Sequence, residues 1–200
     1  MNDNQRTAKT VERSRMKTLR PALFLDRDGV INEEVHYLWK PEDCRLVPGI
    51  IPLLQTAQAL GYVTVVITNQ AGIGRGMYSE ADFHVLMDHI QAELAPHNVR
   101  LDAIYFSPFH PEHGVGEYKI DTDCRKPAPG MILRAAEEHG LDISRSVLVG
   151  DRCTDIGAGT AAGIPHLFLF GNTEAAPCEG SYRKIDSLAE VESTLRTLSA

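Results

Sequence analysis

The sequence predicts an α/β fold in which helices cover both faces of a doubly wound parallel sheet. Short apolar runs recur along the chain, and segments with helical apolar spacing alternate with them. Polar residues also follow the ends of several runs. Such alternation is typical of right-handed βαβ crossovers, which build parallel sheets. Ligands of these sheets bind beyond the carboxyl ends of the strands, so we expect the functional site there.

Five runs are expected as strands. The first covers residues 22–25 and ends at Asp26, and the second covers 63–68 and consists largely of β-branched residues, as is typical of a central strand. The others cover residues 103–106, 147–149 and 166–170.

Four segments are expected as helices. A helix over residues 50–60 stops at Gly61, and a helix from Ser79 to about Leu94 begins with Ser79 and Asp82 in the spacing of a capping box. The remaining two cover 129–139 and 155–162. The segment 107–125 has no clear periodicity, and loops of that length are usually functional in compact domains.

Length and composition indicate one ordinary globular domain. The chain has 200 residues, 24% of them charged, and a net charge of −7, which disfavours a general nucleic-acid binder. Residues 1–20 hold six basic and two acidic residues with few apolar ones, and we expect a disordered tail there, followed by a single domain over 21–200.

The four cysteines and the lack of long apolar runs indicate a soluble, cytoplasmic protein. No two cysteines form a CxxC pair and no secretory signal precedes them, so we expect them to be reduced, with Cys153 as a small packing residue. No run approaches the roughly 18 residues of a membrane helix. No exposed apolar seam is evident, and we expect a monomer.

Two carboxylates, Asp26 and Asp28, follow the first expected strand with one residue between them. There they can face one cation, and one carboxylate can attack a phosphoryl group while the other moves the proton. A solvated turn explains this spacing equally well.

Thr68 and the glycine-rich segment 69–76 follow the second strand. A hydroxyl and a run of backbone amides suit the oxygens of a phosphoryl group, and Arg75 can contact a second anion. The alternative is a flexible turn.

Lys126 precedes the third helix, and Asp151 follows the fourth strand. A lysine there can neutralise a phosphoryl oxygen and a carboxylate, and Asp151 adds an oxygen ligand of the kind that Mg²⁺ prefers. Asp155 can complete the metal shell or bond Lys126, although the spacing of the two aspartates also fits a helix cap. Four such signatures at the strand ends of one sheet favour a phosphoryl-transfer site.

The strings LDRDGVIN, ITNQAGIGRG, DCRKPAPGM and VGDRCTD resemble the four motifs of the haloacid dehalogenase-like (HAD-like) phosphatases. They are similar above all to the heptose-bisphosphate phosphatases, with the histidinol-phosphate phosphatases as near relatives. The resemblance covers residues 21 to about 170. It implies a Rossmann-like, HAD-type sheet with short cap loops and no large cap domain.

The resemblance implies roles for individual residues. Asp26 is the expected nucleophile and Asp28 the expected general acid and base, while Thr68 and Lys126 hold the phosphoryl group. The expected ligands of Mg²⁺ are Asp26, Asp151 and the backbone carbonyl of Asp28. Together with Arg75 of the glycine-rich segment, the expected substrate contacts are Glu34, Val35, His36, Tyr37, Asn69, Gln70, Ala71, Arg125 and Arg152.

The implied reaction hydrolyses a sugar phosphate through an aspartyl-phosphate, with D-glycero-D-manno-heptose 1,7-bisphosphate as the expected substrate. Arg75, Arg125 and Arg152 supply more positive charge than one phosphoryl group needs, which favours a bisphosphate. Histidinol phosphate or another small phosphomonoester is the alternative. A phosphoacceptor receiver domain is an alternative of another class, but its nucleophile follows a middle strand of the chain.

Many members of this subfamily bind a structural zinc ion in the loop before Arg-Lys-Pro. The matching positions here are Ser107, Phe109, Thr122 and Cys124, of which only Cys124 can bind zinc as those ligands do. A structural zinc site needs four ligands. We therefore expect Mg²⁺ but no zinc.

Overall fold

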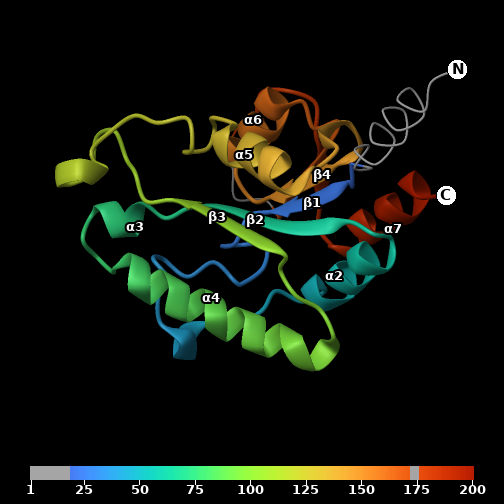
Figure 1. The fold of residues 1–200 in the computed structure, drawn as a ribbon, viewed down its shortest axis with the longest axis horizontal. Helices are drawn as coiled ribbons and strands as arrows, with labels where there is room; N and C mark the ends of the chain where they lie inside the picture. Colours follow the sequence, from blue (N-terminus) through green and yellow to red (C-terminus); the bar gives the residue numbers. More distant parts are fainter. Residues whose placement is uncertain (1–18, 172–175) are drawn as a thin grey trace, which may run out of the picture.

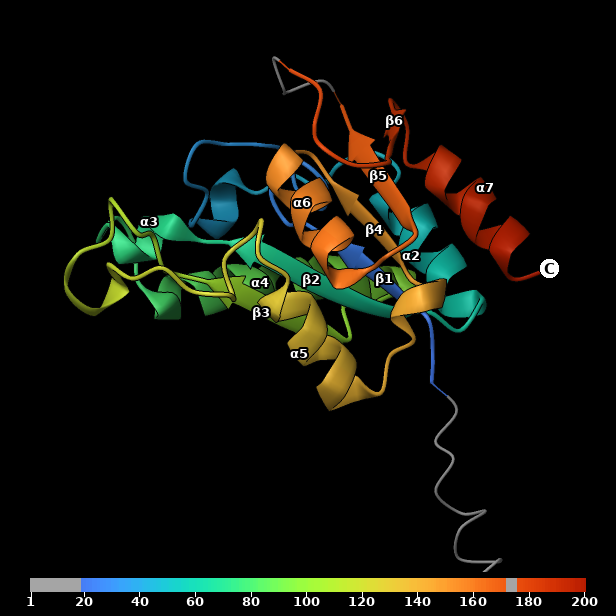
Figure 2. The same cartoon turned by 90° about the horizontal axis from the view of Figure 1, so that it is seen from above.

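The computed structural model describes residues 19–171 and 176–200, so the expected tail over residues 1–20 lies almost wholly outside the described residues. Six parallel strands form one sheet in the order β3-β2-β1-β4-β5-β6 (Figures 1 and 2). The strands are β1 (Ala22–Leu25), β2 (Val63–Asn69), β3 (Ala103–Ser107), β4 (Val147–Gly150), β5 (His166–Phe170) and β6 (Arg183–Ile185).

Helices cover both faces of this sheet, as Figures 1 and 2 show from two directions. One face carries α2 (Ile50–Ala59), α4 (Glu80–Leu94) and α7 (Ala189–Leu198), and the other carries α5 (Gly130–His139) and α6 (Cys153–Ala162). A single turn, α3 (Ala71–Gly74), follows β2. Short 3-10 turns cover Pro41–Asp43, Ala95–His97, Gly116–Tyr118 and Ile143–Arg145. The predicted doubly wound fold is confirmed.

The central strand β1 shows why a strand of this sheet is an unbroken apolar run in the sequence. Leu23 and Leu25 pack into the core under α2 and α4, while Ala22 and Phe24 pack into the core under α5 and α6. All four side chains are fully buried, because successive side chains of a strand point to opposite faces and both faces are covered.

The C-terminal elements β6 and α7 were not predicted. The strand β6 has only three residues, two of them charged and exposed, so it carries no apolar run. The helix α7 buries only Val191 and Leu195. The capping box of α4 is confirmed: Ser79 Oγ accepts from Asp82 N at 3.1 Å, and Asp82 Oδ2 accepts from Ser79 N at 2.8 Å.

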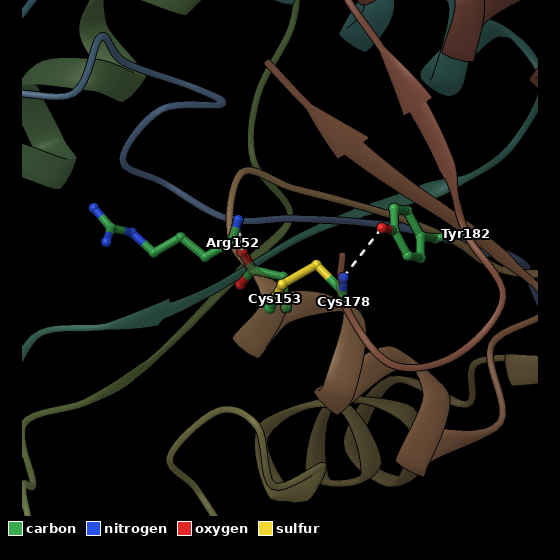
Figure 3. Close-up of a disulfide and its surroundings, with 5 residues drawn as sticks. Arg152, Cys153, Cys178 and Tyr182 are labelled. Atoms are coloured by element: carbon green, nitrogen blue, oxygen red, sulfur yellow. Dashed lines mark hydrogen bonds between the residues drawn. A yellow bond between two sulfur atoms is a disulfide. The ribbon is translucent and has the colours of Figure 1, made fainter. Parts of the chain in front are cut away.

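The expectation that Cys153 is a reduced packing residue is wrong. Cys153, the first residue of α6, forms a disulfide with Cys178, whose backbone N–H donates to Tyr182 Oη at 3.1 Å (Figure 3). The two cysteines are 25 residues apart, so no local pattern signals the pair. Cys44 and Cys124 are free thiols. Among the described residues, no helix is both long and apolar enough to span a bilayer.

Candidate active site

The four predicted motifs meet at one edge of the sheet because their strands are neighbours and parallel. Leu25 at the end of β1 is in register with Val66 of β2 and Val149 of β4. The next residue, Asp26, therefore lies between the ends of these strands, and its backbone N–H donates to Val149 O at 3.0 Å. The predicted motifs therefore lie together at the carboxyl edge of the sheet.

Lys126 bridges two carboxylates at the floor of the site. Its Nζ lies 2.9 Å from Asp26 Oδ1 and 2.5 Å from Asp155 Oδ1, and it donates to the carbonyl of Ile67 at 2.8 Å. Burial alone would lower the pKa of Lys126, but Asp155 and Asp26 raise that pKa above its ordinary value. The amine is therefore a permanent cation beside Asp26.

Three carboxylates form an acidic cluster next to this lysine. Asp26, Asp151 and Asp155 each offer an oxygen, and these oxygens lie within 4.8 Å of one another. Burial raises the pKa of Asp26 to about 7, against the opposing effect of Lys126, and burial together with Asp26 and Asp155 raises the pKa of Asp151 to about 8. This concentration of buried negative charge suits a divalent cation that prefers oxygen ligands.

Gly29 allows Asp151 to approach the turn after β1. A Cβ atom at this position would lie 2.5 Å from Asp151 Oδ2, and the backbone has a φ of +79°. Both conditions require glycine.

The carboxylate of Asp28 points to a different set of partners. Arg27 Nη2 donates to both oxygens at 2.8 Å, and Asn32 Nδ2 and Gln70 Nε2 each donate at 3.1 Å. The Asp28 side chain is not part of the acidic cluster, and the metal ligand predicted at this position is its backbone carbonyl.

Thr68 and Asn69 end β2 and Gln70 follows it, and the three side chains have different hydrogen-bond partners. Gln70 Nε2 donates to Thr68 Oγ1 at 2.8 Å, and Gln70 Oε1 accepts from Tyr78 Oη at 2.6 Å. The amide of Asn69 bonds the backbone N–H and carbonyl of Lys126, each at 3.0 Å. In this structure Asn69 holds the lysine segment in place, a contact that the sequence did not reveal.

A cavity of about 350 Å³ opens above these groups. It is lined by all ten expected substrate residues: Glu34, Val35, His36, Tyr37, Asn69, Gln70, Ala71, Arg75, Arg125 and Arg152. The expected catalytic residues Asp26, Asp28, Thr68 and Lys126 also line it. Asp151 is not among the lining residues and is 98% buried, since only 2% of its surface is exposed.

Five further residues line the cavity without having been predicted: Arg27, Gly72, Tyr78, His110 and Thr154. His110 Nδ1 accepts backbone N–H bonds from Glu112 and His113, so the neutral ring carries its proton on Nε2 and is a donor. Burial and the nearby Arg125 lower the pKa of His110, which favours that neutral form. In the sequence, only the position of His110 in the long loop over residues 107–125 indicated a possible role at the site.

The three arginines at the rim are attached to different segments. Arg75 Nη1 donates to Tyr37 Oη at 2.7 Å, Arg125 Nη1 to the carbonyl of Phe109 at 3.0 Å, and Arg152 Nη2 lies 3.4 Å from Glu34 Oε1. They bring positive charge to the mouth of a cavity whose floor is acidic.

Hydrogen bonds link Ser107, Thr122 and Cys124 around the long loop. Thr122 Oγ1 donates to Cys124 Sγ at 3.3 Å, and the Cys124 thiol lies 3.6 Å from Ser107 Oγ. The ring of Phe109 packs against Tyr118, with 6.0 Å between centroids. Polar and aromatic contacts therefore hold this loop.

The chain has relatives that cover most of its length. It is 48% identical to a D-glycero-alpha-D-manno-heptose-1,7-bisphosphate 7-phosphatase of Burkholderia mallei over 78% of this chain and 82% of that protein. It is 43% identical to a D-glycero-beta-D-manno-heptose-1,7-bisphosphate 7-phosphatase of Vibrio cholerae over 72% of this chain and 78% of that protein. The chain belongs to the heptose-bisphosphate phosphatase family of HAD-like phosphatases.

Two further comparisons agree with this family. Residues 123–191 match the family model described as HAD-hydrolase-like. The crystal structure of a D,D-heptose 1,7-bisphosphate phosphatase from B. bronchiseptica, complexed with magnesium and phosphate, superposes with a TM-score of 0.75 at 30% identity, covering 88% of this chain and 98% of that one. The protein is accordingly a phosphatase with the HAD fold.

Proposed function

We propose that this phosphatase hydrolyses the 7-phosphate of D-glycero-D-manno-heptose 1,7-bisphosphate. One observation carries the proposal: a single cavity has Asp26 and Lys126 at its floor and Arg75, Arg125 and Arg152 at its rim. A floor of this kind suits the phosphoryl group that reacts, and the rim cations suit a second phosphate on the same sugar. The names of the two curated relatives support the same substrate.

The residues of the chain have distinct roles in a two-step mechanism. Asp26 attacks the phosphorus in line, and Asp28 gives its proton to the leaving sugar oxygen, which forms an aspartyl-phosphate. Asp28 then takes a proton from water, which hydrolyses that intermediate. Lys126 and Thr68 hold the oxygens of the phosphoryl group through both steps.

We propose that Asp26, Asp151 and the carbonyl of Asp28 hold Mg²⁺. The acidic cluster fits a small cation with oxygen ligands, and its third member, Asp155, is paired with Lys126. When bound, Mg²⁺ reduces the repulsion between the nucleophilic carboxylate and the phosphate dianion.

We propose no zinc in the loop over residues 107–125. Cys124 is the only thiolate donor among the four matching positions, and its sulfur is hydrogen-bonded to Thr122 and lies beside Ser107. Elemental analysis of protein purified without chelator tests this, because stoichiometric zinc contradicts it.

A substrate panel with Mg²⁺ tests the proposed specificity. We expect the highest kcat/KM for heptose 1,7-bisphosphate, assayed as both anomers, and lower values for heptose 7-phosphate, which lacks the second phosphate. A preference for histidinol phosphate would contradict the sugar assignment. Arg125→Met should lower kcat/KM for the bisphosphate more than for the monophosphate, because only the former presents a second anion.

The nucleophile has its own test. Asp26→Asn should abolish hydrolysis, because an amide cannot form the acyl-phosphate. Near-complete activity of this variant would overturn the mechanism. Thermal unfolding of the variant with and without phosphate controls for folding.

We further propose that residues 21–200 act as one domain, as a monomer and in the cytoplasm. Residues 21–171 and 176–200 share one sheet and its two flanking cores, which supports a single unit. Size-exclusion chromatography with light scattering tests the monomer.

A further inference from the structure

Arg27 is a buried arginine with no part in the proposed chemistry. It lies between Asp26 and Asp28 in the sequence, its exposed fraction is 1%, and it is among the largest fully buried side chains. Burying a guanidinium is unfavourable unless it is paired and hydrogen-bonded. The partners of this side chain therefore indicate what it does.

Those partners are the proposed general acid and one backbone carbonyl. Arg27 Nε and Nη2 donate to Asp28 Oδ1 at 3.1 and 2.8 Å, and Nη2 also donates to Asp28 Oδ2 at 2.8 Å. Nη2 further donates to the carbonyl of Leu38 at 3.1 Å. The guanidinium carbon lies 5.6 Å from the ring centroid of Phe83, which closes the far side.

The contact with Leu38 links Asp28 to the substrate side of the cavity. Leu38 follows directly on Glu34, Val35, His36 and Tyr37, which line the cavity, and Tyr37 has a left-handed backbone with a φ of 56°. Asn32 and Gln70 add one hydrogen bond each to Asp28, and Tyr78 holds Gln70. Of Arg27, Asn32 and Gln70, only Arg27 donates both to Asp28 and to Leu38, at the end of the loop over residues 34–38.

We infer that Arg27 is a positioning residue, which orients the Asp28 carboxylate toward the leaving oxygen and ties that orientation to the loop over residues 34–38. The inference rests on the proposed function, since it assigns Asp28 the role of general acid. A purely structural arginine would neutralise a buried charge without affecting proton transfer.

Leaving groups of different quality separate these two roles. Heptose 1,7-bisphosphate releases an alkoxide that must be protonated, whereas 4-nitrophenyl phosphate releases a stable anion. The parameter kcat/KM reports only the steps up to formation of the aspartyl-phosphate. The later step, in which Asp28 acts as a base, therefore does not affect it. The ratio of the two kcat/KM values is also independent of the fraction of enzyme that is folded.

Arg27→Met replaces the guanidinium with an apolar chain of similar length. General acid catalysis contributes about 10²–10⁴-fold, so we expect kcat/KM for the sugar phosphate to fall about 100-fold and that for 4-nitrophenyl phosphate to fall less than about fivefold. Arg27→Lys keeps the charge but offers one nitrogen instead of two, and we expect an intermediate ratio. If Arg27→Met does not fold, Arg27→Lys carries the test.

Three controls complete the experiment. Asp28→Asn should show the same selective loss for the sugar phosphate, and the Arg27→Met, Asp28→Asn double variant should have the ratio of Asp28→Asn alone, because both changes act through one group. Leu53→Ala, a core change in α2 away from the cavity, should leave the ratio unchanged.

The outcomes distinguish the inference from the proposed function. If Asp28→Asn is selective but Arg27→Met and Arg27→Lys lower both kcat/KM values by the same factor, Arg27 is structural and the inference is overturned. If Asp28→Asn itself is not selective, Asp28 is not the general acid, and the proposed mechanism fails together with the inference.

Discussion

At the scale of single residues, the site is a balance of buried charges. Asp26, Asp151 and Asp155 are each less than a tenth exposed, and Lys126 is the buried cation that contacts two of them. The sequence motif before α5 thus supplies the counter-charge for motifs after β1 and β4. These ion pairs offset the unfavourable interaction between a lysine near a helix start and the helix dipole.

Removing this lysine should cost stability as well as activity. Lys126→Met leaves Asp26 and Asp155 without their cation, and breaking a buried ion pair by deleting one partner costs about 3–5 kcal/mol. Urea unfolding in the absence of divalent cations measures the loss. Lys119→Met, at an exposed lysine, is the matched control and should change the free energy of unfolding by less than about 0.5 kcal/mol. Equal values for both variants would mean that the ion pairs add nothing.

At the scale of elements, strand ends and helix starts build the site. The helix α6 begins two residues after Asp151, carries Asp155 in its first turn, and is tied at Cys153 to the chain before β6. The disulfide therefore anchors the helix that carries one member of the acidic cluster, Asp155. Before this helix, the carboxylate of Asp151 packs directly on Gly29.

Loss of the disulfide should loosen this helix. A crosslink between residues 25 apart stabilises a protein by about 3 kcal/mol in the chain-entropy account, so Cys178→Ser should lower the free energy of unfolding by about that amount. A reducing agent should lower the melting temperature of the unmodified protein to that of the variant and leave the variant unaffected. Disulfides are rare in reducing compartments, so thiol alkylation during cell lysis would show whether the bond exists in cells. A melting temperature that neither change affects would contradict the prediction.

At the scale of the whole molecule, metal binding and folding are linked through pH. The pKa values of Asp26 and Asp151, raised to about 7 and 8 by burial, exceed those of the unfolded chain. Without metal, the folded protein binds more protons than the unfolded one between about pH 4 and 8, so its stability falls as pH rises through that range.

Magnesium should reverse much of this fall. The ion binds the deprotonated carboxylates, so the rise in melting temperature on adding Mg²⁺ should be larger at pH 8 than at pH 5.5. A concentration 100-fold above the Kd stabilises the folded state by about 2.7 kcal/mol. Asp151→Asn should weaken both the pH dependence and the effect of Mg²⁺. An equal rise at both pH values would contradict the linkage.

The sequence by itself determined five of the six strands, the helices α2, α4, α5 and α6 that alternate with them, and the residues at the carboxyl edge of the sheet. Periodicity and caps are local properties, and parallel strands bring their ends together whatever the details of packing. For this reason Asp26, Thr68 and Asp151 could be placed at one site from their positions at strand ends, and Lys126 from its position before the third expected helix.

Only the tertiary structure decided how these side chains pair. Three contacts depend on the positions of side-chain atoms to within a few ångströms. They are the ion pair between Lys126 and Asp155, the hydrogen bonds of Arg27 to Asp28 and Leu38, and the disulfide between Cys153 and Cys178. The short strand β6 also depends on a neighbour, β5, because its own three residues bury only Ile185. Such distances follow from packing of distant segments, which no local sequence pattern encodes.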